Sequence, residues 1–244
     1  MTDMRLRPIL DAIDAAGIDA VALIPGPNFR HVFGRDFHLM ERPLIVIVPR
    51  GQDPVAIVPN LEMASFDTLK FPGAVFDWRD ETGFADAFAA AAAALPQLAG
   101  GAKLGVEGQR MRVFEQLALQ KVFPETTIVD AQAAISSVRL VKSPAEVEKL
   151  RAAIRISEAA LESTLAQVRI GQTEKEIEAI LLGQLFAHGA DGLAFDPIVA
   201  AGDNSAQPHA RARTDYRTRK GDALLFDFGA SHRGYNADIT RTFF

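Results

Sequence analysis

The amino-acid sequence predicts an α/β domain followed by an α+β domain. In the first part of the chain, short apolar runs alternate with helical patterns, which is typical of a layered α/β domain with a partly parallel sheet. After about residue 140, two long helical patterns with clear start signals precede three strand-like segments. The 244 residues suffice for two small domains. We place these domains at residues 1–138 and 139–244.

The composition excludes several classes of protein. Hydrophobic residues make up 48% and charged residues 23%, a balance typical of globular proteins. The formal net charge is -5 and the basic patch at residues 217–220 is short, so no nucleic-acid or membrane partner is expected. The lack of cysteine excludes disulfides and thiolate zinc sites and fits a cytoplasmic location. Asp11 and Asp14 interrupt the N-terminal apolar positions, so no signal peptide is expected there.

The elements of the first domain follow from apolar periodicity and breakers. Apolar residues recur at helical spacing from Leu6 to Ile13, and Gly17 ends that helix. We expect Asn28 to cap the segment after the first strand. Strands are predicted at residues 18–24, 43–51, 54–59, 74–78, 103–107 and 126–130, the second and third as hairpin partners, with helices at 83–95 and 111–121.

The second domain opens with two helices that carry capping boxes. Ser143 is a good N-cap and Glu146 lies three residues later, which predicts a helix over residues 142–168. Thr173 and Glu176 repeat this pattern for a second helix, which Gly189 ends.

The last 24 residues contain two aspartates with symmetric spacing. If the flanking strands form a hairpin centred between residues 232 and 233, Ser231 faces Gly234 and Asp227 faces Asp238. Two opposed carboxylates repel each other and lose hydration in an apolar sheet, and a divalent cation compensates for both costs. The alternative is that the aspartates end their strands and face solvent.

Several motifs around these aspartates resemble the catalytic domain of the creatinase/prolidase/Xaa-Pro aminopeptidase family. The helix start at residues 142–153 and the N-terminal α/β layer are also similar to that family. The resemblance implies a creatinase-like α/β domain followed by part of an α+β domain with the pita-bread fold. The motifs are Asn204-Ser205-Ala206, Pro208-His209, Asp227-x-Gly229, Gly234-Tyr235 and Asp238-x-Thr240-Arg241-Thr242.

The resemblance also implies roles for individual residues. The family's peptidases hold two divalent ions (Mn, Zn or Co) with two Asp, one His and two Glu, and Asp227 and Asp238 match the two Asp ligands. His209 matches a histidine beside the metals that binds substrate or moves a proton. Thr240 would orient a metal ligand. Tyr235 would either project into the cleft or pack in the hairpin.

One departure limits these implications. In the family, the His ligand and both Glu ligands follow the segment that corresponds to the end of this sequence. This sequence stops at Phe244 and does not include them. We therefore expect an incomplete metal site and a chain that is inactive by itself, as a fragment of a longer protein would be.

The resemblance implies metal-dependent hydrolysis of Xaa-Pro peptide bonds by an aminopeptidase or dipeptidase that forms homodimers. One alternative is a creatinase-like hydrolase of a carbon–nitrogen bond, or a lyase, that acts on a small molecule. Another is an inactive fragment or a metal-free binding protein on the same fold. The aspartate pair favours the metal-dependent reading.

Overall fold

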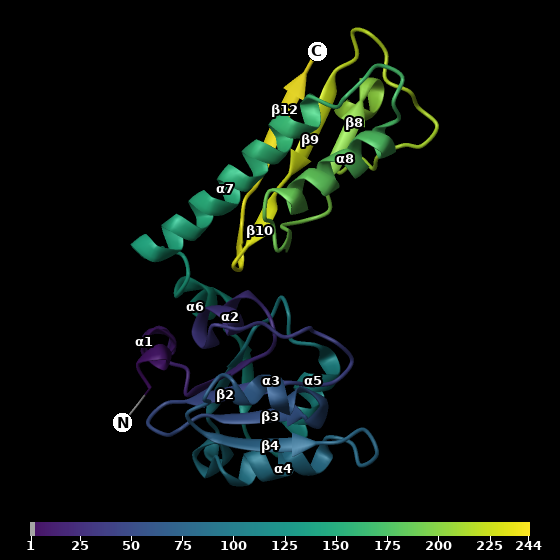
Figure 1. Ribbon diagram of the computed structural model, residues 1–244. Helices are drawn as coiled ribbons and strands as arrows, with labels where there is room; N and C mark the ends of the chain where they lie inside the picture. Colours follow the sequence, from purple (N-terminus) through teal and green to yellow (C-terminus); the bar gives the residue numbers. More distant parts are fainter. Residues whose placement is uncertain (1–2) are drawn as a thin grey trace. The chain divides into compact units, whose positions relative to one another are not determined.

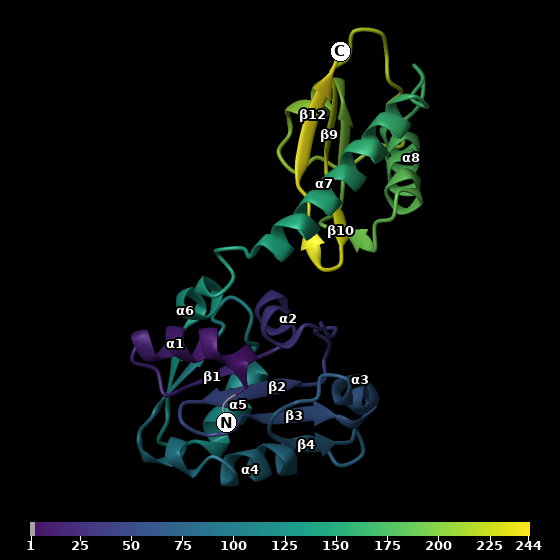
Figure 2. The ribbon, with the colours of Figure 1, turned by 60° about the vertical axis from the view of Figure 1, so that its left-hand side comes forward.

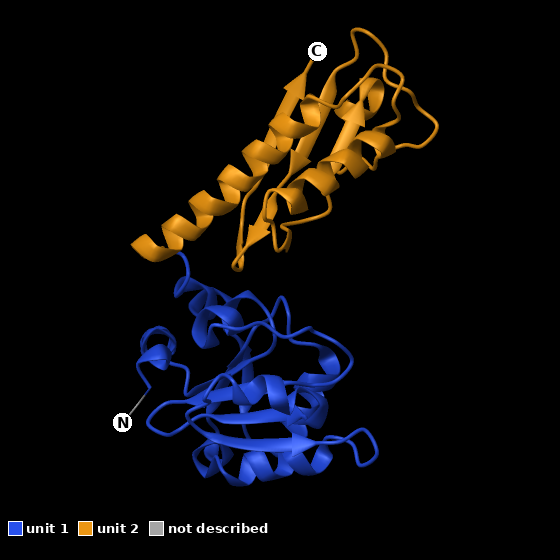
Figure 3. Cartoon of the chain, viewed as in Figure 1, with its two compact units in different colours: residues 1–141 blue, residues 142–244 orange. Residues whose placement is uncertain are grey.

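The computed structural model describes residues 3–244. It divides the chain into two compact units, residues 1–141 and 142–244 (Figure 3). The division falls three residues after the boundary predicted from the sequence. Among the residues described, no helix is long and apolar enough to cross a lipid bilayer.

A six-stranded mixed sheet forms the centre of the first unit. The strand order is β4-β3-β2-β1-β5-β6. The predicted hairpin is confirmed, because β2 and β3 pair antiparallel, while β1 pairs parallel to β5. The strands are β1 (Ala20–Leu23), β2 (Ile45–Pro49), β3 (Val55–Pro59), β4 (Ala74–Trp78), β5 (Lys103–Val106) and β6 (Thr127–Asp130).

Helices cover both faces of this sheet, as Figures 1 and 2 show. Every residue of β1, β2 and β3 is buried, which explains why these strands are continuous apolar runs. One face packs against α1 (Arg7–Ala15), α2 (Pro27–Phe33), α3 (Met63–Asp67) and α6 (Gln132–Ser137). The other face packs against α4 (Ala85–Ala93) and α5 (Val113–Val122). Short 3-10 turns lie at Met4–Leu6, Asn60–Glu62 and Pro96–Gly100.

The expected capping role of Asn28 is wrong. Helix α2 begins at Pro27 with Gly26 as its N-cap, so Asn28 lies inside the first turn. Its buried amide nitrogen donates to Glu107 Oε1 at 2.8 Å, and its Oδ1 accepts from Arg139 Nε at 2.6 Å. These partners lie 79 and 111 residues away, which is why local patterns did not reveal them.

Glu107 makes the stability of the first unit depend on pH. Burial raises the pKa of this carboxyl, and hydrogen bonds from Asn28 and Ile24 oppose the shift only in part. A folded-state pKa above the unfolded value stabilises the fold below the ordinary pKa near 4.5, and that stabilisation is lost as pH rises through the folded pKa. Wild type should therefore lose stability relative to Glu107→Gln over this window, by at most about 1.4 kcal/mol per pH unit.

Urea unfolding of both proteins at several pH values above 4.5 measures this difference. The comparison cancels the other titrating groups, which the two proteins share. If the two stability curves run parallel, the pKa of Glu107 is the same in the folded and unfolded chains.

The second unit begins with the two predicted helices, α7 (Pro144–Leu165) and α8 (Glu174–Ala187). Both capping boxes are confirmed. The Glu146 amide donates to Ser143 Oγ at 3.4 Å, and the Glu176 amide donates to Thr173 Oγ1 at 3.1 Å. These local hydrogen bonds satisfy amide groups that the helix itself leaves unpaired.

Two small sheets pack against these helices (Figure 1). One has the order β12-β9-β8 and the other β11-β10-β7. Phe226 and Phe228 of β9 enter the core under the helices, so Asp227 between them points to the opposite face. The strands are β7 (Gly192–Leu193), β8 (Ile198–Ala201), β9 (Leu224–Phe228), β10 (Ala230–His232), β11 (Tyr235–Asn236) and β12 (Ile239–Phe243), with a 3-10 turn at Gly202–Ala206.

The register predicted for the terminal hairpin is wrong by two residues. His232 pairs with Tyr235, and Asp227 pairs with Thr240 rather than with Asp238. The loop therefore consists of Arg233 and Gly234, whose φ angles of 48° and 80° are both positive. Such angles define the tight two-residue turns whose twist matches that of paired strands, with Gly favoured at the second position.

Candidate active site

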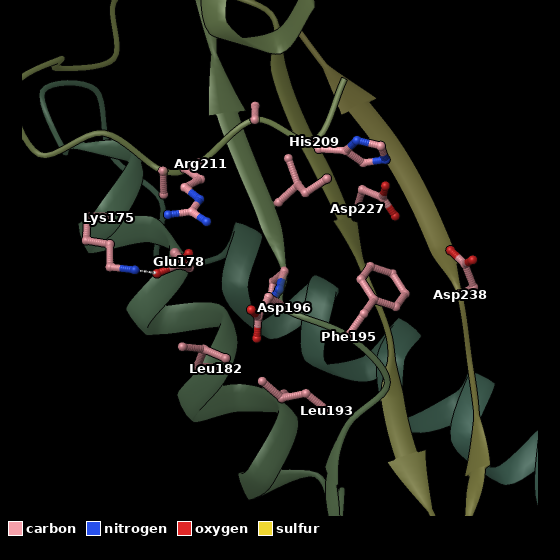
Figure 4. Close-up of a pocket in the computed structure, with 14 residues that line it drawn as sticks. Lys175, Glu178, Leu182, Leu193, Phe195, Asp196, His209, Arg211, Asp227 and Asp238 are labelled. Carbon is pink, nitrogen blue, oxygen red and sulfur yellow. Dashed lines mark ion pairs between the residues drawn. The ribbon is translucent and has the colours of Figure 1, made fainter. Parts of the chain in front are cut away.

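A pocket of about 900 Å³ lies in the second unit (Figure 4). Its wall combines one side of α8, the segment from residue 193 to the start of β8, part of the loop that follows β8, Asp227 of β9, and Asp238 just before β12. Three of the predicted site residues line it, namely His209, Asp227 and Asp238. The pocket is thus the place where the separate sequence motifs meet.

Although the register differs from the predicted one, Asp227 in β9 and Asp238, the residue before β12, both line the pocket. Asp238 lies two residues before Thr240, the partner of Asp227, and side chains two residues apart share one face of a strand. Such diagonal neighbours are typically about 7–8 Å apart between strands. A shift of two residues therefore keeps both carboxylates on the same face, whereas a shift of one would have separated them.

His209 enters the pocket from the loop between β8 and β9. Its backbone has a φ of 56°, in the left-handed region that non-glycine residues adopt only rarely. The ring is exposed and stands toward the side of the pocket where the two aspartates lie (Figure 4). It can therefore donate or accept a proton within this pocket.

The electrostatics differ from what the sequence suggested. Asp227 is half-buried and Asp238 is exposed, so neither carboxylate loses most of its hydration. Within residues 3–244, no hydrogen bond or ion pair engages the side chain of Asp227, Asp238 or His209. Their polar atoms are thus available to a ligand.

Asp227 and Asp238 offer the type of ligand atom that a divalent cation prefers, but two carboxylates are fewer ligands than such a cation needs. Carboxylate oxygens are hard ligands that suit Mn²⁺, Mg²⁺ and Zn²⁺. However, no group of three or more His, Cys, Asp or Glu able to hold a metal ion exists among the described residues. Asp227 and Asp238 can therefore supply only part of a coordination shell.

The two remaining predicted residues lie elsewhere. Thr240 sits beside Asp227 in the β9–β12 pair, with an exposed side chain. Tyr235 is placed against α7, where its hydroxyl donates to Glu146 Oε1 at 2.9 Å and Lys149 Nζ lies 4.9 Å from its ring centre. Among the residues that the structure describes, neither Thr240 nor Tyr235 belongs to the pocket wall.

Sequence reasoning missed several residues of the pocket. Phe195 and Asp196 come from the segment before β8, and Lys175 and Glu178 form an ion pair on α8. Arg211 lies two residues after His209 and contributes a second positive charge. Two of these residues lie close to motifs found in the sequence, since Glu178 follows the capping box at Thr173 and Arg211 follows His209. However, no local pattern shows that the side of α8 with Lys175 and Glu178 faces the pocket.

Comparison with known proteins agrees with this architecture. Residues 5–141 match the model of the creatinase/prolidase N-terminal domain, and residues 148–244 match that of metallopeptidase family M24. The chain belongs to the creatinase/prolidase/Xaa-Pro aminopeptidase family of metallopeptidases. The predicted fold class, a creatinase-like α/β domain followed by part of a pita-bread domain, is confirmed.

Individual relatives are similar over nearly the whole chain. An Xaa-Pro dipeptidase of Pyrococcus horikoshii is 31% identical over 243 residues, 98% of this chain and 63% of the relative. A crystal structure of prolidase from Thermococcus sibiricus has a TM-score of 0.86 at 27% identity, covering 99% of this chain and 65% of that one. For an X-Pro aminopeptidase from Thermotoga maritima the TM-score is 0.74 at 28% identity, with 99% and 65% covered. The chain thus spans about two thirds or slightly less of these relatives' lengths.

Proposed function

We propose that the chain provides part of the active site of a metal-dependent peptidase that hydrolyses Xaa-Pro bonds. The observation that carries this proposal is the meeting of Asp227, Asp238 and His209 in one pocket. The similarity to an Xaa-Pro dipeptidase over 98% of the chain supports the substrate class. Homodimer formation and a cytoplasmic location remain predictions.

The three residues would divide the work by their chemistry. Asp227 and Asp238 would contribute carboxylate oxygens to bound Mn²⁺, Zn²⁺ or Co²⁺. Such an ion, when bound, polarises a carbonyl group and lowers the pKa of a coordinated water. His209 would hydrogen-bond the substrate or transfer a proton at its imidazole nitrogens. Thr240, the cross-strand neighbour of Asp227, would help to orient that carboxylate.

In this proposal Tyr235 takes the second of its two predicted roles, packing in the hairpin. Its hydroxyl is held by Glu146 in the first turn of α7, so it would fasten the hairpin to the start of that helix. Contact with the substrate would then fall to residues of the pocket wall such as Phe195, whose ring offers an apolar surface for a proline side chain.

A complementation assay tests the function. The chain is fused to the part of the Pyrococcus horikoshii relative that it does not cover, and hydrolysis of Ala-Pro is followed with Mn²⁺ present. We expect turnover, with kcat/KM at least about 100-fold lower in His209→Ala because a proton-transfer group is lost. The matched control is His188→Ala, which removes an exposed histidine outside the pocket wall.

The outcomes separate the candidate functions. Turnover of Ala-Pro that depends on Mn²⁺ and on His209 supports the proposal. Hydrolysis of a carbon–nitrogen bond in a small guanidino compound such as creatine without metal, by a fusion that leaves Ala-Pro intact, would instead show a creatinase-like activity. A folded fusion that His209→Ala leaves fully active toward Ala-Pro would refute the role of His209.

A further inference from the structure

The loop that carries His209 is closed at its base around a buried carboxylate, and the Arg213 side chain also donates from Nη2 to the Ala201 carbonyl at 3.0 Å. The loop comprises residues 202–212, between the end of β8 at Ala201 and Arg213. Glu174, the first residue of α8, is fully buried and lies where the two ends of the loop meet. Its Oε1 accepts from the Ala201 amide at 2.7 Å, and its Oε2 accepts from the Arg213 amide at 2.7 Å.

Side chains complete the hydrogen bonding of this carboxylate. Arg213 Nη2 donates to Oε1 at 3.1 Å, and this interaction raises the pKa of the guanidinium. Asn204 Nδ2 donates to Oε2 at 2.9 Å. The buried carboxylate of Glu174 is paired with Arg213 and accepts hydrogen bonds at both oxygens. These interactions offset the cost of removing its charge from water and hold the side chain in place.

Asn204 extends the connection from Glu174 toward His209. The same amide nitrogen also donates to the carbonyl of Arg211 at 3.1 Å. Arg211 lies only two residues beyond His209. A single side chain therefore joins the buried carboxylate to the backbone next to the histidine.

His209 bears a conformational cost that the loop must offset. Its φ of 56° places a Cβ-bearing residue in the left-handed region, where L-residues other than Gly and Asn are disfavoured. Such a backbone persists only where its surroundings over-determine it, and these residues tend to gather at functional sites. Here the surroundings are the closed loop and its anchor at Glu174.

We propose that Glu174 is a positioning residue, which holds the backbone of His209 in the left-handed conformation and so directs its ring into the pocket. Only the use of that ring in catalysis rests on the proposed function. The positioning itself is a property of the 244-residue chain and can be measured without any activity.

The decisive test compares glycine with alanine at position 209 in two backgrounds. In the otherwise native chain, His209→Gly should melt about 4 °C above His209→Ala, because only alanine pays for a positive φ. In the Glu174→Gln background the loop can relax, so this advantage should vanish or reverse in favour of alanine. The coupling between the two sites, measured by calorimetry, is the expected result.

Two controls separate positioning from general support of the fold. Glu176→Gln removes a charge from the same helical turn without touching the loop, so the advantage of glycine at position 209 should persist. At Lys70, a non-glycine residue of the first unit with a φ of 48°, the corresponding glycine–alanine difference should be the same with and without Glu174→Gln.

A spectroscopic measurement gives an independent readout. In protein labelled with ¹³C-histidine, the ring resonance of His209, identified by its loss in His209→Ala, should shift or broaden in Glu174→Gln and stay unchanged in Glu176→Gln. If Glu174→Gln does not fold, Asn204→Ala cuts the same connection and should act in the same direction. An unchanged glycine–alanine difference together with an unmoved resonance would overturn the proposal, whether or not the fused enzyme cleaves Ala-Pro.

Discussion

Gly229→Ala is expected to destabilise the second unit by about 3 kcal/mol. A Cβ added at Gly229 would lie 1.8 Å from the carbonyl oxygen of Ala237, which is far inside contact distance. That oxygen belongs to the backbone of the opposing chain segment and cannot turn away like a flexible side chain. The segments that carry Asp227 and Asp238 would therefore have to separate.

Gly192→Ala is the matched control. Gly192 lies in β7 of the same unit, and the atom nearest to a Cβ added there is 4.0 Å away, so alanine should be tolerated. Urea unfolding of the three proteins measures both effects, and loss of the amide cross-peaks of β9 and β12 would show where the structure opens. A stability of Gly229→Ala within 0.5 kcal/mol of wild type, the usual range of a neutral surface change, would mean that the hairpin is more open than described.

The second large effect concerns metal binding by the 244-residue chain. We expect a Kd for Mn²⁺ of about 1 mM or weaker and no detectable cleavage of Ala-Pro, because two carboxylates leave most of the coordination shell to water. Among residues 3–244 there is no group of three or more His, Cys, Asp or Glu that could hold a metal ion. Calorimetric titration with Mn²⁺ and a parallel peptide assay measure the two quantities.

Paramagnetic broadening by Mn²⁺ locates the weak site within the chain. Amides of residues 226–228 and 238–240 should broaden first, and Asp227→Asn or Asp238→Asn should remove the effect. Asp215→Asn, which changes an exposed aspartate outside the pocket wall, should not. Tight binding of two ions together with turnover would show that residues other than Asp227 and Asp238 also bind the metal.

Features set by neighbouring residues could be predicted from the sequence. The capping boxes at Ser143 and Thr173 depend on hydrogen bonds that span three residues, and both are present. Apolar runs located all six strands of the first unit, and the pairing of β2 with β3 was expected from the short turn between them. The short helices α3 and α6 were not predicted, because their five and six residues carry little periodicity.

The sequence predicted some of the residues that line the candidate site but not the strand register that brings them together. The spacing of Asp227 and Asp238 placed them on one face, although the wrong register was assumed. The position of the turn was decided by Arg233 and Gly234, whose positive φ angles make a two-residue loop. The register was wrong by two residues. Because side chains alternate with a period of two along a strand, this error did not change the face on which the two aspartates lie.

The sequence by itself determined the element types, the helix starts, the two-domain order and the residues that carry the family motifs, because each depends on short-range geometry. Only the tertiary structure decided which distant groups meet. It joined Asn28 to Glu107 across 79 residues, and Glu174 to Arg213 across 39. It also brought His209 into the pocket of the two aspartates. Such contacts depend on how whole elements pack, and packing is a property of volumes and hydrogen-bond partners brought together from the entire chain.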